Sequence, residues 1–145
     1  MNQDFRDLSA EFNAQRVEFL IVGAHALAVH GHVSATRDLG IWVRPDPANA
    51  QRVLRALKSF GAPTEDLTVD DFSHPDLIFQ IGVPPVRIDM LTAITEVEFQ
   101  EAWDARVMTR FVDQEVGAIS RVHLIRNKRA SGRTQDLADL ESLEG

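Results

Sequence analysis

The sequence predicts an α/β fold in which a sheet is flanked by helices. Short apolar runs of strand length alternate with segments whose apolar residues recur at helical spacing, and two pairs of strand-like runs are separated by hairpin-length breaks. With 145 residues, of which 44% are hydrophobic and 26% charged, the chain has the size and composition of one globular domain over residues 1–145.

Three elements are expected before residue 32. A helix is predicted over residues 2–15, because apolar residues recur there at helical spacing. The continuous apolar run 19–22 predicts a buried strand that ends at Gly23. Residues 24–30 favour a second helix, which Gly31 ends.

Residues 36–42 are predicted to form a strand that an acidic residue opens. Because side chains alternate along a strand, Asp38 would share one face with Gly40 and Trp42, while the other face is apolar and must be covered. A carboxylate at the start of a half-buried strand suits a hard metal ion and a phosphate substrate, but one carboxylate rarely suffices. Its partners must therefore come from elsewhere in the chain.

The next helix has clear signals at both ends. Asp46 is expected to cap it, Pro47 to occupy its first position and Gly61 to follow its last residue. Residues 62–75 are acidic and irregular, with one helical turn expected over 69–72.

Two hairpins are expected in the second half of the chain, because strand-like runs are paired there across short breaks. Asp89 lies in one of these runs and is a second strand-borne carboxylate. The strands are 77–81 with 86–91, and 107–112 with 116–119.

Three helices complete the prediction. The first lies between the hairpins, where Thr95 and Glu98 fit a capping box at its start. The other two are expected over 121–130 and 135–143, separated at Ser131-Gly132. Val122 and Ile125 are expected to face inward from the first of these two, and Leu137 and Leu140 to pack from the second. Its acidic residues Asp136, Asp139, Glu141 and Glu144 are expected to face solvent or basic neighbours.

Composition narrows the classes of function. The chain has no cysteine, so metal ligands would have to be Asp, Glu or His. Its N-terminus is polar and acidic, and no apolar run approaches the roughly 20 residues that a membrane span needs, so we expect a soluble, cytoplasmic protein without a membrane partner. A net charge of −7 argues against binding nucleic acid through the overall field.

One basic segment stands apart from this acidic background. Five of the 15 Lys and Arg residues lie between residues 121 and 133, with no acid among them. The segment is the best candidate for an anion-facing surface, and a solvated helix face is an equally good interpretation.

Together these motifs resemble the nucleotidyltransferases of the DNA polymerase beta superfamily, in particular small prokaryotic members such as the minimal nucleotidyltransferases and abortive-infection toxins. The resemblance implies the nucleotidyltransferase fold, whose mixed, mostly antiparallel sheet is backed by helices. The matching segments run in order from about residue 19 to 141. They are 21–26, 30–31, 36–42, 86–91, 124–130, Arg133 and 135–140.

The resemblance assigns roles to individual residues. Asp38 and Asp89 match carboxylates that hold Mg²⁺ in a two-metal site and take part in catalysis. Gly23 and Ala24 match a turn whose backbone N–H groups bind the nucleotide's phosphates. The remaining nucleotide-binding residues are Thr36 and Arg37 beside Asp38, and Lys128 in the basic segment.

Two positions depart from the family pattern. Ala24 stands where a second small glycine or serine is common, which keeps the backbone donors but removes a hydroxyl. Gly40 stands where the middle carboxylate belongs, so we expect weak metal binding and slow or absent transfer. A glycine inside a strand also marks a bulge or the close approach of a ligand or backbone, and Gly40 is open to that interpretation.

The resemblance implies a metal-dependent transfer of a nucleoside monophosphate from a nucleoside triphosphate (NTP) to a hydroxyl on protein, RNA or a small molecule. The alternative is a catalytically degraded module that binds a nucleotide, a nucleic acid or a partner protein, in a toxin–antitoxin pair for example. The macromolecular partners implied are a cognate antitoxin or a second copy of the chain.

Overall fold

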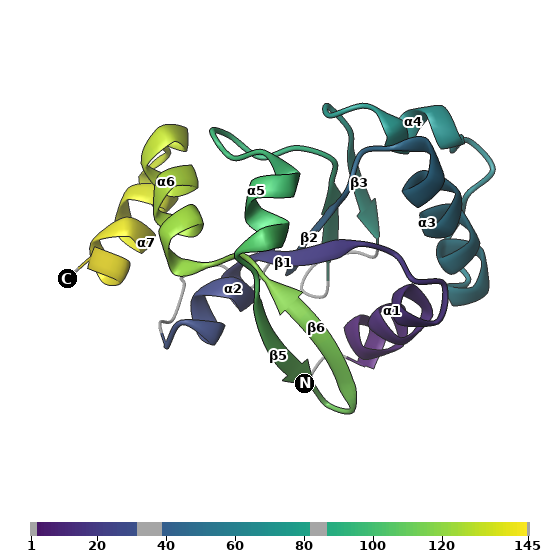
Figure 1. Ribbon diagram of the computed structural model, residues 1–145, viewed down its shortest axis with the longest axis horizontal. Helices are drawn as coiled ribbons and strands as arrows, with labels where there is room; N and C mark the ends of the chain where they lie inside the picture. The colour runs from purple at the N-terminus through teal and green to yellow at the C-terminus, as the bar shows by residue number, and fades with distance from the viewer. Residues whose placement is uncertain (1–2, 32–38, 82–86, 145) are drawn as a thin grey trace.

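A computed structural model describes residues 3–31, 39–81 and 87–144 (Figure 1). Its centre is a six-stranded sheet with the strand order β3-β4-β2-β1-β6-β5. The strands are β1 (Phe19–Gly23), β2 (Leu39–Val43), β3 (Ile78–Ile81), β4 (Ile88–Leu91), β5 (Val107–Phe111) and β6 (Gln114–Ala118). The helices are α1 (Gln3–Ala14), α2 (Ala24–Val29), α3 (Pro47–Phe60), α4 (Val69–Ser73), α5 (Phe99–Asp104), α6 (Arg121–Ser131) and α7 (Thr134–Glu144).

The sheet is mixed and mostly antiparallel, as predicted. Strands β1 and β2, β3 and β4, and β5 and β6 pair antiparallel, whereas β1 with β6 and β2 with β4 pair parallel. The predicted elements that fall within the described residues are present with shifts of one or two residues at their ends. The start of the predicted strand 36–42 lies outside those residues.

Helices cover both faces of the sheet, and each face has its own apolar core. On one face, α1, α3 and α4 pack against the strands through buried residues such as Phe12, Ile41 and Leu57. On the other face the core includes Trp42 and Leu124, with residues from α2, α5, α6 and α7. Figure 1 shows α1, α3 and α4 on the right of the view and α6 with α7 on the left, with α2 and α5 drawn between them. The face covered by α6 and α7 carries the candidate site.

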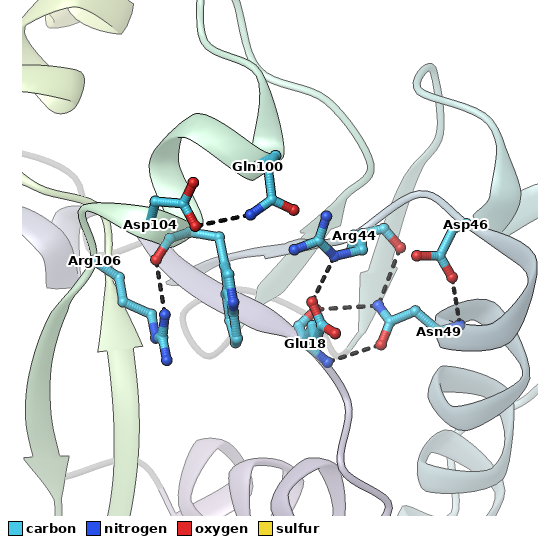
Figure 2. Close-up of polar contacts among 8 residues, drawn as sticks. Glu18, Arg44, Asp46, Asn49, Gln100, Asp104 and Arg106 are labelled. Atoms are coloured by element: carbon cyan, nitrogen blue, oxygen red, sulfur yellow. Dashed lines mark hydrogen bonds and ion pairs between the residues drawn. The ribbon is translucent and has the colours of Figure 1, made fainter.

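A buried asparagine fastens α3 to the sheet. The Asn49 side chain is 2% exposed, accepts a hydrogen bond from the Glu18 backbone N–H at 2.8 Å, and donates to the carbonyl oxygens of Glu18 and Arg44 at 3.1 and 3.0 Å (Figure 2). An ion pair between Arg44 Nε and Glu18 Oε2 at 2.5 Å lies beside these bonds. The helix itself begins where Asp46 accepts a hydrogen bond from the Asn49 N–H at 2.7 Å, as the sequence predicted.

The capping box predicted at Thr95 and Glu98 is wrong. Helix α5 begins at Phe99 after Glu98, with no side-chain cap. Ile94 and Val97 instead form an antiparallel bridge around a turn in which Glu96 has φ 66°. A residue with positive φ cannot belong to the first turn of a right-handed helix, so the helix starts later than the motif indicates.

Over the described residues, none of the helices has both the length and the apolar character that crossing a membrane requires.

Candidate functional site

A cleft of about 700 Å³ lies between the sheet and the α6–α7 pair. Its floor is formed by the ends of four strands, its far wall by α6 and α7, and one rim by residues 93–95. The cleft brings together Gly23, Gly40, Asp89 and Lys128, which the sequence analysis singled out from four separate segments. Its other lining residues are Val22, Ile78, Gln80, Leu91, Ala93, Ile94, Thr95, Asn127, Ser131, Arg133, Asp136 and Asp139.

Gly23 forms the junction between β1 and α2 at one end of the cleft. Its φ of 75° and ψ of −147° lie in a region that is essentially restricted to glycine. This conformation turns the chain directly from strand into helix, and Ala24 becomes the first helical residue. The predicted glycine turn therefore exists and faces the cleft.

Asp89 lies on the floor of the cleft, next to Gly40 in the parallel β2–β4 ladder. Neighbours in a ladder project from the same face, so a side chain at position 40 would stand beside the Asp89 carboxylate. That carboxylate is 22% exposed, and its Oδ1 lies 3.2 Å from Arg87 Nε. The charge is thus partly compensated by the residue that precedes β4.

Packing against β1 requires a glycine at position 40. The family resemblance would place a carboxylate at the same position. A Cβ atom added there would lie 2.8 Å from Val22 Cγ2 and 3.1 Å from the Val22 carbonyl oxygen. Val22 belongs to the neighbouring strand β1 and pairs directly with Gly40. The close-approach interpretation of this glycine is therefore supported, with β1 as the approaching segment.

Lys128 reaches the cleft from α6, but two carboxylates already hold its ammonium group. Lys128 is 8% exposed, and its Nζ lies 3.1 Å from Asp136 Oδ1 and 3.1 Å from Asp139 Oδ2, both on α7. The two aspartates are 1% and 3% exposed. Burial raises the pKa of Asp136, but hydrogen bonds from Arg133 and Lys128 outweigh that effect and hold the pKa below its usual value. The three groups form a buried, charge-paired unit in the wall.

The faces predicted for these two helices are wrong at Val122 and Leu137. Val122 is 67% exposed and Leu137 is 53% exposed, although both were expected to pack. Asp136 and Asp139 do face basic neighbours, as expected, but they are buried with them. Pairing with Lys128 decides the orientation of α7, because a buried lysine needs compensating charge. The sequence signal for this arrangement is a lysine in the last turn of one helix, a glycine after it, and two acids three residues apart in the next helix.

The basic segment between residues 121 and 133 does not present a row of free cations. Arg126 pairs with Glu101, and this hydrogen bond holds the pKa of Glu101 below its usual value. Desolvation opposes the shift, and His123 adds a smaller effect in the same direction as Arg126. Arg133 donates two hydrogen bonds to Asp136. Arg121 donates to the Leu143 carbonyl oxygen, and Arg129 also has a partner. The segment is thus largely neutralised.

Three predicted site residues, Thr36, Arg37 and Asp38, lie outside the described residues. Within the parts of the chain that the structure does describe, no group of three or more His, Cys, Asp or Glu side chains is arranged to hold a metal ion. Of the two predicted metal ligands, Asp89 alone is therefore placed, and it faces the cleft.

The sequence matches no protein-family profile and no curated protein. Three solved structures resemble the fold at low sequence identity. A candidate nucleotidyltransferase from Thermotoga maritima has a TM-score of 0.64 and 11% identity, with 97% of this chain and 93% of that chain covered. The lincosamide antibiotic adenylyltransferase LnuA, solved with lincomycin bound, has a TM-score of 0.62 and 14% identity, with 100% and 97% covered.

The third is an antigenic nucleotidyltransferase-like protein from Paracoccidioides brasiliensis, with a TM-score of 0.51, 15% identity, and 94% of this chain and 71% of that chain covered. Two of these neighbours are described as nucleotidyltransferases or similar to them and one as an adenylyltransferase, and two of the three match over nearly their whole length. The chain therefore has the fold of the nucleotidyltransferase superfamily, as its motifs predicted.

Proposed function

We propose that the chain binds a nucleoside triphosphate in the cleft and transfers the nucleoside monophosphate to a hydroxyl acceptor. The observation that carries this proposal is the convergence of Gly23, Asp89 and Lys128 on one cleft of a nucleotidyltransferase fold. LnuA, a neighbour that matches over the full length of this chain, is an adenylyltransferase for an antibiotic. A hydroxyl on a small molecule is therefore the first acceptor to test.

The reaction requires little covalent chemistry from the protein. The acceptor's hydroxyl oxygen forms a bond to the α-phosphorus, the bond from that phosphorus to the bridging oxygen breaks, and pyrophosphate leaves. The hydroxyl proton must pass to a base, and Asp89 is the carboxylate on the cleft floor suited to accept it. Lys128, fixed by its two aspartates, would present its remaining N–H bond toward the phosphates.

Magnesium would be held by Asp89 together with Asp38. Bound there, the ion would supply charge stabilisation for the attacking and leaving oxygens. The placed residues fit such an ion only in part. Gly40 offers no ligand, and the Arg87 guanidinium at 3.2 Å competes with a cation for the Asp89 carboxylate. We therefore propose a weakened site in which water and substrate phosphates supply most of the ligands.

A second function is favoured by the packing around Gly40. Because β1 occupies the space of a Cβ at residue 40, a carboxylate there is incompatible with the present position of Val22. A protein that binds a nucleotide without catalysing its transfer would not need that carboxylate. We propose this nucleotide-binding module as the alternative.

Calorimetric titration of ATP with and without Mg²⁺, into the wild type and Asp89→Asn, tests the proposal. We expect Mg²⁺ to strengthen ATP binding in the wild type and to have a smaller effect in Asp89→Asn. An assay with ATP labelled at the α-phosphate and lincomycin as acceptor then separates the two functions. A nucleotidyltransferase transfers the label to lincomycin, whereas a nucleotide-binding module does not. Failure of each of the four common NTPs to bind, with or without Mg²⁺, would contradict both functions.

Gln100→Ala is the matched control for these titrations. The Gln100 side chain is exposed on α5 and donates a hydrogen bond to Asp104 Oδ1 at 2.8 Å, away from the lining of the cleft (Figure 2). Its ATP affinity and its magnesium dependence should equal those of the wild type.

A further inference from the structure

The end of the cleft formed by β3 and β4 presents an apolar surface. Ile78 is 66% exposed, although it is a large aliphatic residue in a strand, and it lines the cleft. It pairs directly with Leu91 in the β3–β4 ladder, so the two side chains lie side by side on the same face. Ala93 and Ile94 continue this surface along the rim. Together, Ile78, Leu91, Ala93 and Ile94 form what we call the apolar shelf.

Beyond the triphosphate that Lys128 would contact, the charges that line the cleft do not favour a second substrate that is a polyanion. The described lining carries two cations, Lys128 and Arg133, and three carboxylates, Asp89, Asp136 and Asp139. Both cations are already paired with Asp136.

The basic segment next to the cleft compensates little for this balance, because Arg126 is engaged by Glu101, Arg133 by Asp136 and Arg121 by the Leu143 carbonyl oxygen, and Arg129 also has a partner. Binding of RNA or DNA depends on cations that neutralise several phosphates. The arrangement therefore disfavours a nucleic-acid acceptor beside the nucleotide, and it suits an acceptor that brings an apolar surface and no negative charge.

We propose that the acceptor is a small, uncharged or cationic molecule whose apolar part lies on the apolar shelf. This inference rests on the proposed function and adds the chemical class of the second substrate. An apolar body on the shelf would remove the exposed face of Ile78 from water. A positive charge on the same molecule would be attracted by the excess of carboxylates in the cleft. The hydroxyl to be modified would then lie on the Asp89 side of the shelf.

Two fluorescent probes with a common apolar body test the charge and the position of this subsite. Dansylcadaverine carries one positive charge and dansylglycine one negative charge, and both gain fluorescence in apolar surroundings. We expect dansylcadaverine to bind about tenfold more tightly than dansylglycine at low salt, with the difference shrinking as salt rises. Bulk transfer RNA should not displace dansylcadaverine.

The variant Ile78→Ser locates the probe, and Val122→Ser is its matched control. Val122 is 67% exposed, almost the same as Ile78, but it lies on α6 outside the lining of the cleft. We expect Ile78→Ser to weaken dansylcadaverine binding roughly fivefold to tenfold through lost apolar contact, and Val122→Ser to leave it unchanged. Circular dichroism of both variants should match the wild type, because both side chains are exposed.

Titration of Mg-ATP into the same proteins separates this inference from the proposed function. Normal Mg-ATP binding in Ile78→Ser, with weakened dansylcadaverine binding, supports both. Three results would overturn the acceptor class alone, provided that Mg-ATP binds normally. These are equal affinity for the two probes, displacement of dansylcadaverine by transfer RNA, and equal effects of Ile78→Ser and Val122→Ser on dansylcadaverine binding. Absence of Mg-ATP binding, with dansylcadaverine still on the shelf, overturns the proposed function while the subsite stands.

Discussion

Gly40 and Val22 face each other across the β1–β2 ladder so closely that a Cβ on Gly40 would lie 2.8 Å from Val22 Cγ2. Gly40→Ala should therefore destabilise the fold by about 1–3 kcal/mol, as overpacking does in cores. Urea denaturation of Gly40→Ala, Val22→Ala and the double variant measures the coupling. The double variant should be more stable than the sum of the single effects predicts, by roughly 0.5 kcal/mol or more.

Gly117→Ala is the control for that cycle. Its Cβ would meet Arg106 Cδ at 3.0 Å, and Arg106 is exposed, so we expect its side chain to yield at a smaller cost than Val22 does. A cost for Gly117→Ala equal to that of Gly40→Ala, or strict additivity with Val22→Ala, would contradict the packing role of Gly40. The same cycle shows whether Gly40→Asp needs Val22→Ala before it can be tested as a metal ligand.

In the buried unit of Lys128, Asp136 and Asp139, removing the lysine alone should destabilise the fold more than removing all three charges together. Lys128→Met leaves buried carboxylates without their main cation, and we expect a loss of about 3–5 kcal/mol in the free energy of unfolding. Combining it with Asp136→Asn and Asp139→Asn removes the charges together and should recover much of that loss. Guanidinium denaturation of the single and triple variants measures both effects. A triple variant less stable than Lys128→Met would contradict the charge-pairing account.

The ion pair between Arg6 on α1 and Asp113 at the β5–β6 turn predicts a pH dependence. Hydrogen bonds from Arg6 at 2.9 and 2.7 Å lower the pKa of Asp113 from 3.8 to about 2. A carboxyl group whose pKa is lower in the folded state contributes stability above its unfolded pKa, and the contribution is lost as pH falls through the folded value. The contribution of Asp113 should therefore be complete above about pH 4 and vanish toward pH 2.

NMR titration of the Asp113 carboxyl carbon checks this prediction. In Arg6→Gln the pKa of Asp113 should rise toward 3.8, while the pKa of Glu101, which pairs with Arg126, should stay where it is. An Asp113 pKa that does not change in Arg6→Gln would show that the ion pair is not maintained in solution.

Asn49 should matter more to stability than its size suggests. Asn49→Ala removes the partners of two backbone carbonyl oxygens and one N–H group at the junction of β1, β2 and α3, and we expect a loss of about 1–3 kcal/mol. Gln100→Ala, which removes one exposed hydrogen bond, should stay within about 0.5 kcal/mol of the wild type. Thermal denaturation compares the two. Similar values for both variants would contradict the anchoring role.

The sequence was informative where local physics decides the structure. Asp46, Pro47 and Gly61 marked both ends of α3, and the turn at Gly23 was recognisable because only glycine adopts its conformation. The order of the motifs also predicted which strands meet at the cleft. These signals depend on neighbouring residues alone, so no tertiary contact overrides them.

Sequence reasoning failed where contacts between distant residues decide. The capping box at Thr95 gave way to a bridge between Ile94 and Val97. Val122 and Leu137 were wrongly expected to face inward because apolar residues were taken as the buried ones. The basic neighbour of Asp136 and Asp139 was expected, but their burial with Lys128 was not. Close approach at Gly40 was one interpretation of the sequence, but β1 as the approaching segment could not be foreseen because it depends on strand register.

The two sides of the cleft differ in the sequence separation of the residues that are in contact. Lys128 meets Asp136 and Asp139 across a short loop in which Gly132 adopts a left-handed conformation with φ 66°, whereas Gly40 meets Asp89 only after α3, α4 and β3 have intervened. Contacts between near residues lose less chain entropy when they form. The α6–α7 wall should therefore assemble before the β2–β4 floor during refolding. Pulse-labelled hydrogen exchange should show α6 amides protected earlier than those of β4.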